Sequence, residues 1–286
     1  FLEKHKKKNN LSALYVDHQT QKESVHWQKH SEKFCKKRCI NFLCKKVEIK
    51  ETGQGYEAAA RTARLKIFNS LKETSVIILG HHLDDQVETV FFRVLRGTGL
   101  KGLTGMQRHI KINNKDFIRP LLNITKEEIF RYVDDQKLSF IEDHSNLDNT
   151  YSRNFLRNEI IPQIAERWPG AKKNTARMAN LLAKQSSLYH RFLLERLEKI
   201  CDKDGLLLDE LSKLDYFERS EVIRIWLDQK SFASPNESQM KELEKSFFQS
   251  RHDAKPTIKF YREDAQKTGV ILSKINNYLI AEKINE

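Results

Sequence analysis

The stretch Val76-Ile-Ile-Leu-Gly-His-His-Leu-Asp-Asp-Gln-Val-Glu-Thr89 decides the fold of this chain. Its first four residues are all apolar, which is typical of a strand buried on both faces, and Gly80 ends that run. The residues from Asp84 to Leu95 then follow a helical pattern, on which Asp85 and Glu88 share a face with His81. A buried strand leading into an acidic helix predicts an α/β fold with a ligand site at the carboxyl end of the strand, although acids in a first turn are also simply good helix starters.

The sequence before this stretch repeats the alternation of strand and helix. We expect strands at 11–16 and 43–49 and helices at 23–39 and 56–71. Apolar strands that alternate with helices predict a parallel sheet with helices on both faces. Asp17 and His18 follow the first of these strands, so we expect them at the same edge of the sheet as His81 and His82.

The second half of the chain predicts a separate, smaller α/β domain. Pro162 and Trp168-Pro169-Gly170 mark the end of the first domain, and a long amphipathic helix follows. Beyond it we expect helices at 216–227 and 238–248 and strands at 257–261 and 269–272. The predicted division is a first domain at 1–170, a linker helix at 171–203 and a second domain at 204–286.

The charge of the chain favours a polyanionic partner. There are 51 Lys and Arg against 39 Asp and Glu in 286 residues, a net charge of +12. Half of this excess lies between Phe91 and Arg119, where Asp116 is the single acid among seven basic residues: Arg93, Arg96, Lys101, Arg108, Lys111, Lys115 and Arg119. The excess favours nucleic acid, although the same residues can form an ordinary solvated face. No run approaches the ~18 apolar residues of a membrane span, and no signal peptide is recognised, so we expect no membrane partner and a cytoplasmic location.

The four cysteines do not predict a metal centre. Cys35, Cys39 and Cys44 are separated by three and four residues, unlike the pairs of a zinc site or a redox motif, and Cys201 stands apart. We expect free, buried thiols and no structural metal.

Two pairs of arginines are candidates for phosphate binding. Arg61 and Arg64 share a helical face after an alanine-rich start, and Arg153 and Arg157 lie four residues apart. The arginine fork is the preferred partner of a phosphate group. Exposed arginines and helix capping are the alternative explanations at these positions.

Four motifs, in order along residues 11 to 170, resemble the tRNA(Ile)-lysidine synthetases of the PP-loop ATP-pyrophosphatase superfamily. They are Gly80–Thr89, Leu95–Leu103, Arg119-Pro-Leu-Leu122, and Asp143–Asn146 with Arg153-Asn154 and Arg157. The resemblance implies a PP-loop fold, like that of the adenine nucleotide α hydrolases, followed by a tRNA-binding domain.

The resemblance also implies a ligase for tRNA processing. ATP would adenylate the wobble cytidine of tRNA(Ile) with a CAU anticodon, and free L-lysine would then attack C2 to give lysidine and AMP, with pyrophosphate released earlier; a homodimer is possible. The roles implied are: catalysis by Asp85, His81, Arg61 and Arg153; ATP binding by Asp17, His18, His82 and Asp85; Mg²⁺ binding by Asp85; binding of the lysine ammonium by Glu88; and tRNA contact by Arg93, Arg96, Lys101, Arg108 and Arg157.

The phosphate loop of that family, a Ser-Gly-Gly-x-Asp-Ser element after the first strand, does not occur in this sequence. We therefore expect the first strand and its loop to be missing by truncation, and the family's last domain to be missing at the other end. Two alternatives stay open. One is another PP-loop tRNA-modifying enzyme such as a cytidine thiolase, against which the cysteine spacing argues, and the other is a tRNA-binding remnant without catalysis.

Overall fold

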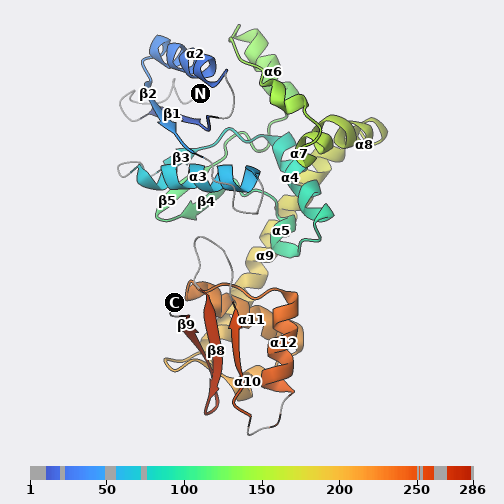
Figure 1. Cartoon of the computed structure of the whole chain (residues 1–286). Coiled ribbons are helices and arrows are strands. Elements are labelled where there is room, and N and C mark those ends of the chain that lie inside the picture. The colour runs from blue at the N-terminus through green and yellow to red at the C-terminus, as the bar shows by residue number, and fades with distance from the viewer. Residues whose placement is uncertain are drawn as a thin grey trace. The chain divides into compact units, whose positions relative to one another are not determined.

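The computed structural model describes residues 11–19, 23–48, 56–71, 76–249, 251, 254–260 and 269–284. The chain divides into two compact units, residues 1–180 and 181–286, which are described separately below (Figure 1). Among the described residues, none of the helices combines the length and the apolar character needed to cross a membrane.

The first unit begins with a strand–helix–strand element. Strand β1 (Ser12–Asp17) pairs in parallel with β2 (Asn41–Lys46), and helix α2 (Ser24–Lys37) makes the crossover that a parallel pair requires. Cys39 takes a left-handed conformation after the helix, with φ 53°, so β2 starts two residues earlier than the sequence predicts.

A second, three-stranded sheet has the order β3-β5-β4. Strand β3 (Val76–Ile78) is parallel to β5 (Lys115–Ile118), which is antiparallel to β4 (His109–Ile112). The β4–β5 turn is Asn113-Asn114, both with positive φ, as a two-residue hairpin turn requires. Helix α3 (Tyr56–Ser70) packs Phe68 edge-on against Phe117 of β5, with ring centroids 5.7 Å apart. The predicted α/β fold is confirmed, and the hairpin is an addition to it.

The helices after β3 form the other part of the first unit. They are α4 (Leu83–Leu95), α5 (Leu100–Leu103), α6 (Lys126–Asp135), the 3₁₀-helix η2 (His144–Leu147), α7 (Ser152–Phe155), the π-helix η3 (Leu156–Ile160), α8 (Ile161–Arg167) and α9 (Ala171–Ile200). Leu83 and Val87 of α4 bury themselves against Leu156, Ile161 and Ala176. This core fixes α4, which carries the acidic residues, against α7, η3, α8 and the start of α9.

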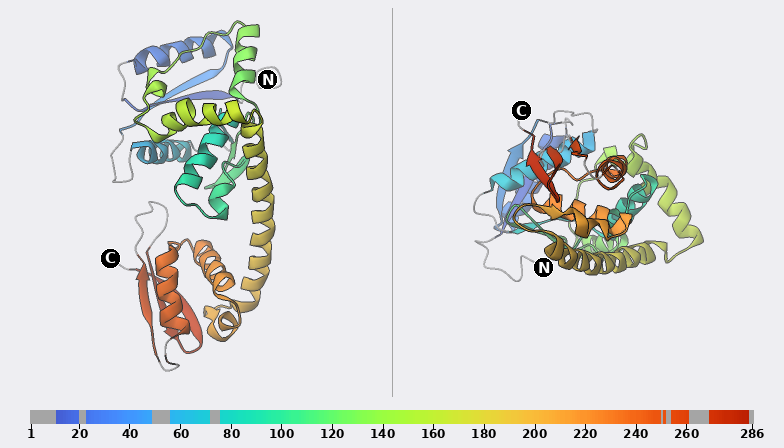
Figure 2. Two further views of the ribbon diagram at one scale, coloured as in Figure 1. Left: turned by 90° about the vertical axis from the view of Figure 1, so that its right-hand side faces the viewer. Right: turned by 90° about the horizontal axis from the view of Figure 1, so that it is seen from below.

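The second unit is an antiparallel sheet with helices packed against it (Figure 2). The sheet has the order β6-β9-β8-β7, formed by β6 (Leu206–Leu207), β7 (Thr257–Phe260), β8 (Val270–Ile275) and β9 (Tyr278–Lys283). Helices α10 (Leu208–Ser212), α11 (Tyr216–Gln229) and α12 (Glu237–Phe248) complete it. Side chains alternate between buried and more exposed along β7 and β8, as expected for a sheet with one covered face. The sequence predicted all of these elements except β6, α10 and β9.

Helix α9 corresponds in sequence to the helix expected at 171–203, and its role as a linker between domains stays a prediction. Its last turns place Leu193, Leu197 and Ile200 in the core of the second unit, while Ala176 belongs to the core of the first. The division at residues 180 and 181 therefore falls inside this helix.

Candidate functional site

The carboxyl ends of β1 and β3 carry the predicted polar residues, although the two strands belong to separate sheets in the described part of the chain rather than to the single sheet expected. Asp17, the last residue of β1, is 4% exposed and accepts the backbone N–H of Gln19 at 2.9 Å. The Nδ1 atom of His18 is buried without a hydrogen-bond partner. Gly80 and His81 separate β3 from α4, and His82 caps the helix. An unpartnered buried ring nitrogen at the end of a strand is a natural contact point for a polar ligand.

His81 is held as a neutral ring. Burial and the adjacent Arg119 guanidinium lower the pKa of His81, and Asp85 opposes them. Arg119 donates from Nε to His81 Nδ1 at 3.3 Å and from a terminal nitrogen to the Gln107 carbonyl at 2.7 Å. Because Arg119 is only 6% exposed, its charge is available to groups inside the site rather than to bulk solvent.

Five arginines lie near one another beside this histidine, three of which act on it directly, and we call the five the guanidinium cluster. Partial desolvation and the charges of Arg61 and Arg153 lower the pKa of both Arg64 and Arg93. Desolvation and Arg61 lower the pKa of Arg119 in the same way. Arginine stays protonated in proteins, so these mutual effects mean that five positive charges repel one another. Such an arrangement stabilises an anion with several negative charges, such as a chain of phosphates.

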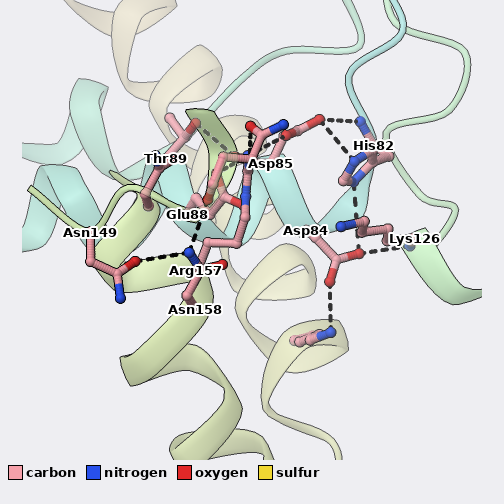
Figure 3. Close-up of polar contacts among 12 residues, drawn as sticks. His82, Asp84, Asp85, Glu88, Thr89, Lys126, Asn149, Arg157 and Asn158 are labelled. Carbon is pink, nitrogen blue, oxygen red and sulfur yellow. Dashed lines mark hydrogen bonds and ion pairs between the residues drawn. The ribbon is translucent and has the colours of Figure 1, made fainter. Parts of the chain in front are cut away.

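The acidic residues of α4 are bonded to residues from several other elements (Figure 3). Asp85 accepts the backbone N–H of His82 with Oδ2 at 2.9 Å, which caps the first turn of the helix. Its Oδ1 lies 3.5 Å from Arg157, and its side chain is 23% exposed. Asp85 is thus oriented by the protein and still reachable from solvent.

Glu88 is enclosed by Arg157, which comes from η3. The guanidinium donates from Nε and from a terminal nitrogen to the two carboxylate oxygens of Glu88, at 2.6 and 2.9 Å. Burial raises the pKa of Glu88 and Arg157 acts against that shift, while the hydrogen bonds to Glu88 raise the pKa of Arg157. The role of Glu88 in binding a lysine ammonium stays a prediction, and it requires the incoming ammonium to replace Arg157.

Asp84, the other acid of the first turn, connects α4 to two more helices. It accepts the backbone N–H of Lys126 at 2.8 Å, at the start of α6. Its other oxygen pairs with Lys172 of α9 at 2.6 Å, and Lys172 also reaches Glu127 at 2.9 Å. Asp84 therefore stabilises the packing of α4 against α6 and α9. Sequence reasoning missed Lys172, because a lysine at the start of a long helix carries no local signal.

The polar loop at 143–149 is fastened to the same site. Arg157 donates to Asn146 Oδ1 at 3.1 Å, and Asn158 donates to the Asn146 carbonyl at 2.9 Å and to Asn149 Oδ1 at 2.8 Å. Asn154 donates to the carbonyl of Ser145 at 2.8 Å. Arg157, predicted to contact tRNA, is thus the residue that joins this loop to the acids of α4.

The other predicted tRNA-binding residues do not form a single group. Arg93 turns its guanidinium to the carbonyls of Gly102 and Gly105, at 2.8 and 2.9 Å, and so closes the loop around α5. Arg96, Lys101 and Arg108 are exposed. Contact between these side chains and tRNA remains a prediction.

The described residues fit the phosphates of a nucleoside triphosphate. The guanidinium cluster matches the charge of phosphates, and the unpartnered His18 ring nitrogen can contact the rest of a nucleotide. No group of three or more His, Cys, Asp or Glu side chains able to hold a metal is found in the part of the chain that the structure describes. Asp85 would therefore be one of the one or two carboxylates that Mg²⁺ takes from a protein when phosphates supply other ligands.

Comparison with known proteins agrees with this geometry. The PP-loop domain family model matches residues 1–164. The chain is 35% identical over 268 residues to the tRNA(Ile)-lysidine synthase of Wigglesworthia glossinidia brevipalpis, which covers 91% of this chain and 67% of that protein. It is 34% identical to the enzyme of Histophilus somni and 33% identical to that of Francisella tularensis, with 87% and 82% of this chain and 59% of each relative covered. The chain thus spans roughly three-fifths to two-thirds of the length of these relatives.

A solved structure shares the fold. The U34-tRNA thiolase NcsA from Methanococcus maripaludis, with its [4Fe-4S] cluster, superposes with a TM-score of 0.50 at 19% sequence identity, covering 61% of this chain and 63% of that one. At this identity the likeness concerns the PP-loop fold alone. The sequence matches over nine-tenths of the chain, together with the PP-loop domain that carries His18, His81 and the guanidinium cluster, establish the family: the chain belongs to the tRNA(Ile)-lysidine synthase family.

Proposed function

We propose that the full-length protein ligates L-lysine to C2 of the wobble cytidine of an isoleucine tRNA with a CAU anticodon, at the expense of ATP. The observation that carries this proposal is the guanidinium cluster beside the oriented Asp85 and the neutral His81. A site with this charge suits a reaction in which two phosphate-bearing substrates, ATP and tRNA, must approach each other.

The first chemical step would be adenylation. The O2 atom of the cytidine attacks the α-phosphorus of ATP, the bond from that phosphorus to the bridging oxygen breaks, and pyrophosphate leaves. Negative charge builds up on the phosphate oxygens, and buried guanidinium groups such as that of Arg119 stabilise it without reorganising. Mg²⁺, when bound at Asp85, would supply further neutralisation of phosphate charge.

The second step would be attack by lysine. Its side-chain amine adds to C2, the C2–O2 bond breaks, AMP leaves with the oxygen, and the amine loses a proton. His81 is the neutral base available near Asp85, because burial and Arg119 lower its pKa and keep the ring unprotonated. We assign the ammonium site of the incoming lysine to Glu88, in exchange for Arg157. Both steps use residues of one chain, so the proposal does not depend on the homodimer that the resemblance implies.

The decisive test is transfer of radiolabelled lysine to tRNA by the full-length gene product. Incorporation that requires ATP and disappears when the wobble cytidine is changed to uridine is the expected result. A protein that binds this tRNA tightly and incorporates no lysine would overturn the proposal in favour of a non-catalytic remnant. Incorporation of sulfur in its place would indicate a thiolase.

A further inference from the structure

An apolar groove lies outside the strand-end site, between the end of α4 and α7. Its volume is about 540 Å³, within the ~300–1,000 Å³ of small-molecule pockets. It is lined by Phe92, Leu95, Arg96, Asn149, Thr150, Ser152, Phe155, Leu156 and Ile160. Leu95 and Phe155 are 72% and 46% exposed, so two large apolar side chains face solvent at its sides. Exposed apolar surface of this kind commonly marks a binding site.

Phe92 connects this groove to the guanidinium cluster. The guanidinium of Arg96, on the groove side, lies 5.3 Å from the centre of the Phe92 ring. The guanidinium of Arg153, a member of the cluster, lies 5.8 Å from the same ring. A ligand whose phosphates bind the cluster therefore has the groove within reach of its next group.

Fixed polar groups stand along one edge of the groove. The Asn149 amide donates to Glu159 at 3.0 Å and accepts from Asn158 at 2.8 Å. The Thr150 hydroxyl donates to Asp148 at 2.7 Å. An amide has two N–H groups and two lone pairs, so an amide oriented in this way can also pair with the edge of a ring that enters the groove.

We propose that the α4–α7 groove holds one unstacked base of the RNA whose phosphates bind the guanidinium cluster. The base lies between the apolar side chains and the Arg96 plane, with its polar edge toward Asn149. Aromatic rings and guanidinium planes are the usual platforms for unstacked RNA bases, and asparagine reads base edges. The choice of RNA as ligand rests on the proposed function; the choice of this groove rests on its geometry.

The charge of the chain favours RNA over a protein segment as the occupant. Residues 181–286 contain 18 Lys and Arg and 18 Asp and Glu, so the entire net charge of +12 belongs to residues 1–180. The groove lies in that unit, is lined by Arg96 and adjoins Arg153 through Phe92, and a polyanion complements it. A second copy of the chain would bring an equally positive surface to the same place.

The test uses the anticodon stem–loop of the CAU isoleucine tRNA, with each loop base in turn replaced by an abasic site. With the chain as it stands, we expect one abasic position to weaken binding about tenfold, because stacking on a protein ring is worth ~1–3 kcal/mol per base. Phe155→Leu and, separately, Arg96→Lys should weaken binding of the intact loop by a similar factor. Each should have no further effect on the RNA that lacks that one base, since the same interaction is already absent there.

Matched controls are available in the same unit. Phe140→Leu changes a ring that is 50% exposed and lies outside the groove, and Arg131→Lys changes an exposed arginine of α6. Both should leave every RNA affinity unchanged. Arg96→Lys changes an exposed side chain and keeps its charge, so it keeps the test valid even if Phe155→Leu lowers stability.

Two results would overturn the inference. One is that the affinity lost through Phe155→Leu or Arg96→Lys adds in full to the affinity lost at every abasic position, so that no single base accounts for the effect of the substitutions. The other is unchanged RNA affinity together with a changed sedimentation coefficient, which would assign the groove to contact between protein copies. Because binding is measured without ATP or lysine, a groove that discriminates bases in a protein that transfers no lysine would refute the proposed function and leave this inference standing.

Discussion

Asp84 and Asp85 are neighbours on α4 but have different partners. These partners show which of the two carboxylates stabilises the fold and which is free to take part in chemistry. Asp84 is bonded to the backbone of Lys126 and to the ammonium of Lys172. Asp85 caps its own helix, by accepting a backbone N–H of the first turn, and is 23% exposed. The acid that is bonded to the scaffold serves stability, and the acid that retains access to solvent is available to a substrate or a metal ion.

Exchange of each acid for its amide tests this division. Asp85→Asn keeps the cap acceptor but removes the charge, so we expect adenylation by the full-length protein to fall by at least ~100-fold, with tRNA binding retained. Asp84→Asn is the matched control: it should cost about 1–3 kcal/mol of unfolding free energy through its weakened bond to Lys172, with adenylation per folded molecule unchanged. Pyrophosphate release and urea unfolding measure the two effects. Near-normal adenylation by Asp85→Asn would contradict the assignment.

The Glu88–Arg157 pair predicts a pH-dependent loss of stability. Arg157→Gln leaves the buried carboxylate without its partner, at a cost of about 3 kcal/mol near pH 7.5, the lower end for buried pairs because Arg157 is 30% exposed. Burial then raises the pKa of Glu88 further, since the opposing hydrogen bonds and charge of Arg157 are gone and only Arg153 still acts against the shift. Because the pKa of Glu88 is higher in the folded state than in the unfolded state, protonation of Glu88 favours folding. The stability gained from this protonation is complete below the unfolded pKa and is lost as pH rises through the folded pKa.

The loss of unfolding free energy caused by Arg157→Gln, relative to the unchanged chain, should therefore be smaller at pH 5 than at pH 7.5. Urea unfolding at both pH values measures it. The double variant with Glu88→Gln removes the titrating group, and its deficit should hardly vary over that range. An Arg157→Gln deficit that grows toward acid pH would show that some other group controls the effect.

At the level of elements, the turn after α5 depends on one glycine. Gly105 has φ +63°, and a Cβ there would lie 2.7 Å from the side-chain amide of Gln86. That amide is 1% exposed and bonds both ways to the backbone of Met106, at 3.0 and 2.6 Å. The loop that Arg93 closes is thus aligned on α4 by a side chain that has no room to move.

Gly105→Ala should lower the unfolding free energy by about 2 kcal/mol or more, from left-handed strain plus loss of the buried Gln86 bonds. Gly80→Ala, where a Cβ meets nothing within 4 Å and φ is not positive, is the control and should change stability little. Urea unfolding of the two variants side by side gives the answer. Equal stability of both would mean that Gln86 can reorient at no cost.

Much of the element order was predictable because the strands are apolar runs and the helices are periodic. The β4–β5 hairpin was not predicted, because each of its strands is only four residues long and half of the residues in each are polar or charged, so neither contains an apolar run. At the site, spacing on one helix predicted that Asp85 and Glu88 share a face. It could not predict that Arg157, 69 residues beyond Glu88, occupies that carboxylate, since such a pairing exists only through tertiary packing.

At the scale of the whole molecule, charge is divided unequally between the two units. All of the net charge of +12 lies in residues 1–180, and residues 181–286 are neutral as a whole. Since release of counterions from phosphates makes RNA affinity depend on salt, the first unit should account for most of the salt dependence of tRNA binding. The second unit would then contribute through shape and specific contacts rather than through attraction at long range.

Two double substitutions, one in each unit, measure how the salt dependence of RNA binding is divided between the units. Replacing Lys101 and Arg108, both exposed in the first unit, by Gln should reduce the slope of log Kd against log salt by about 1.5, or roughly 0.7–0.9 for each phosphate that is no longer neutralised. Replacing Lys241 and Lys245, both exposed on α12, removes the same charge from the neutral unit and should leave the slope nearly unchanged. An equal fall in slope for the α12 pair would mean that the RNA backbone follows local lysines on both units. The electrostatic field that draws RNA to the protein would then not be set by the net charge of each unit.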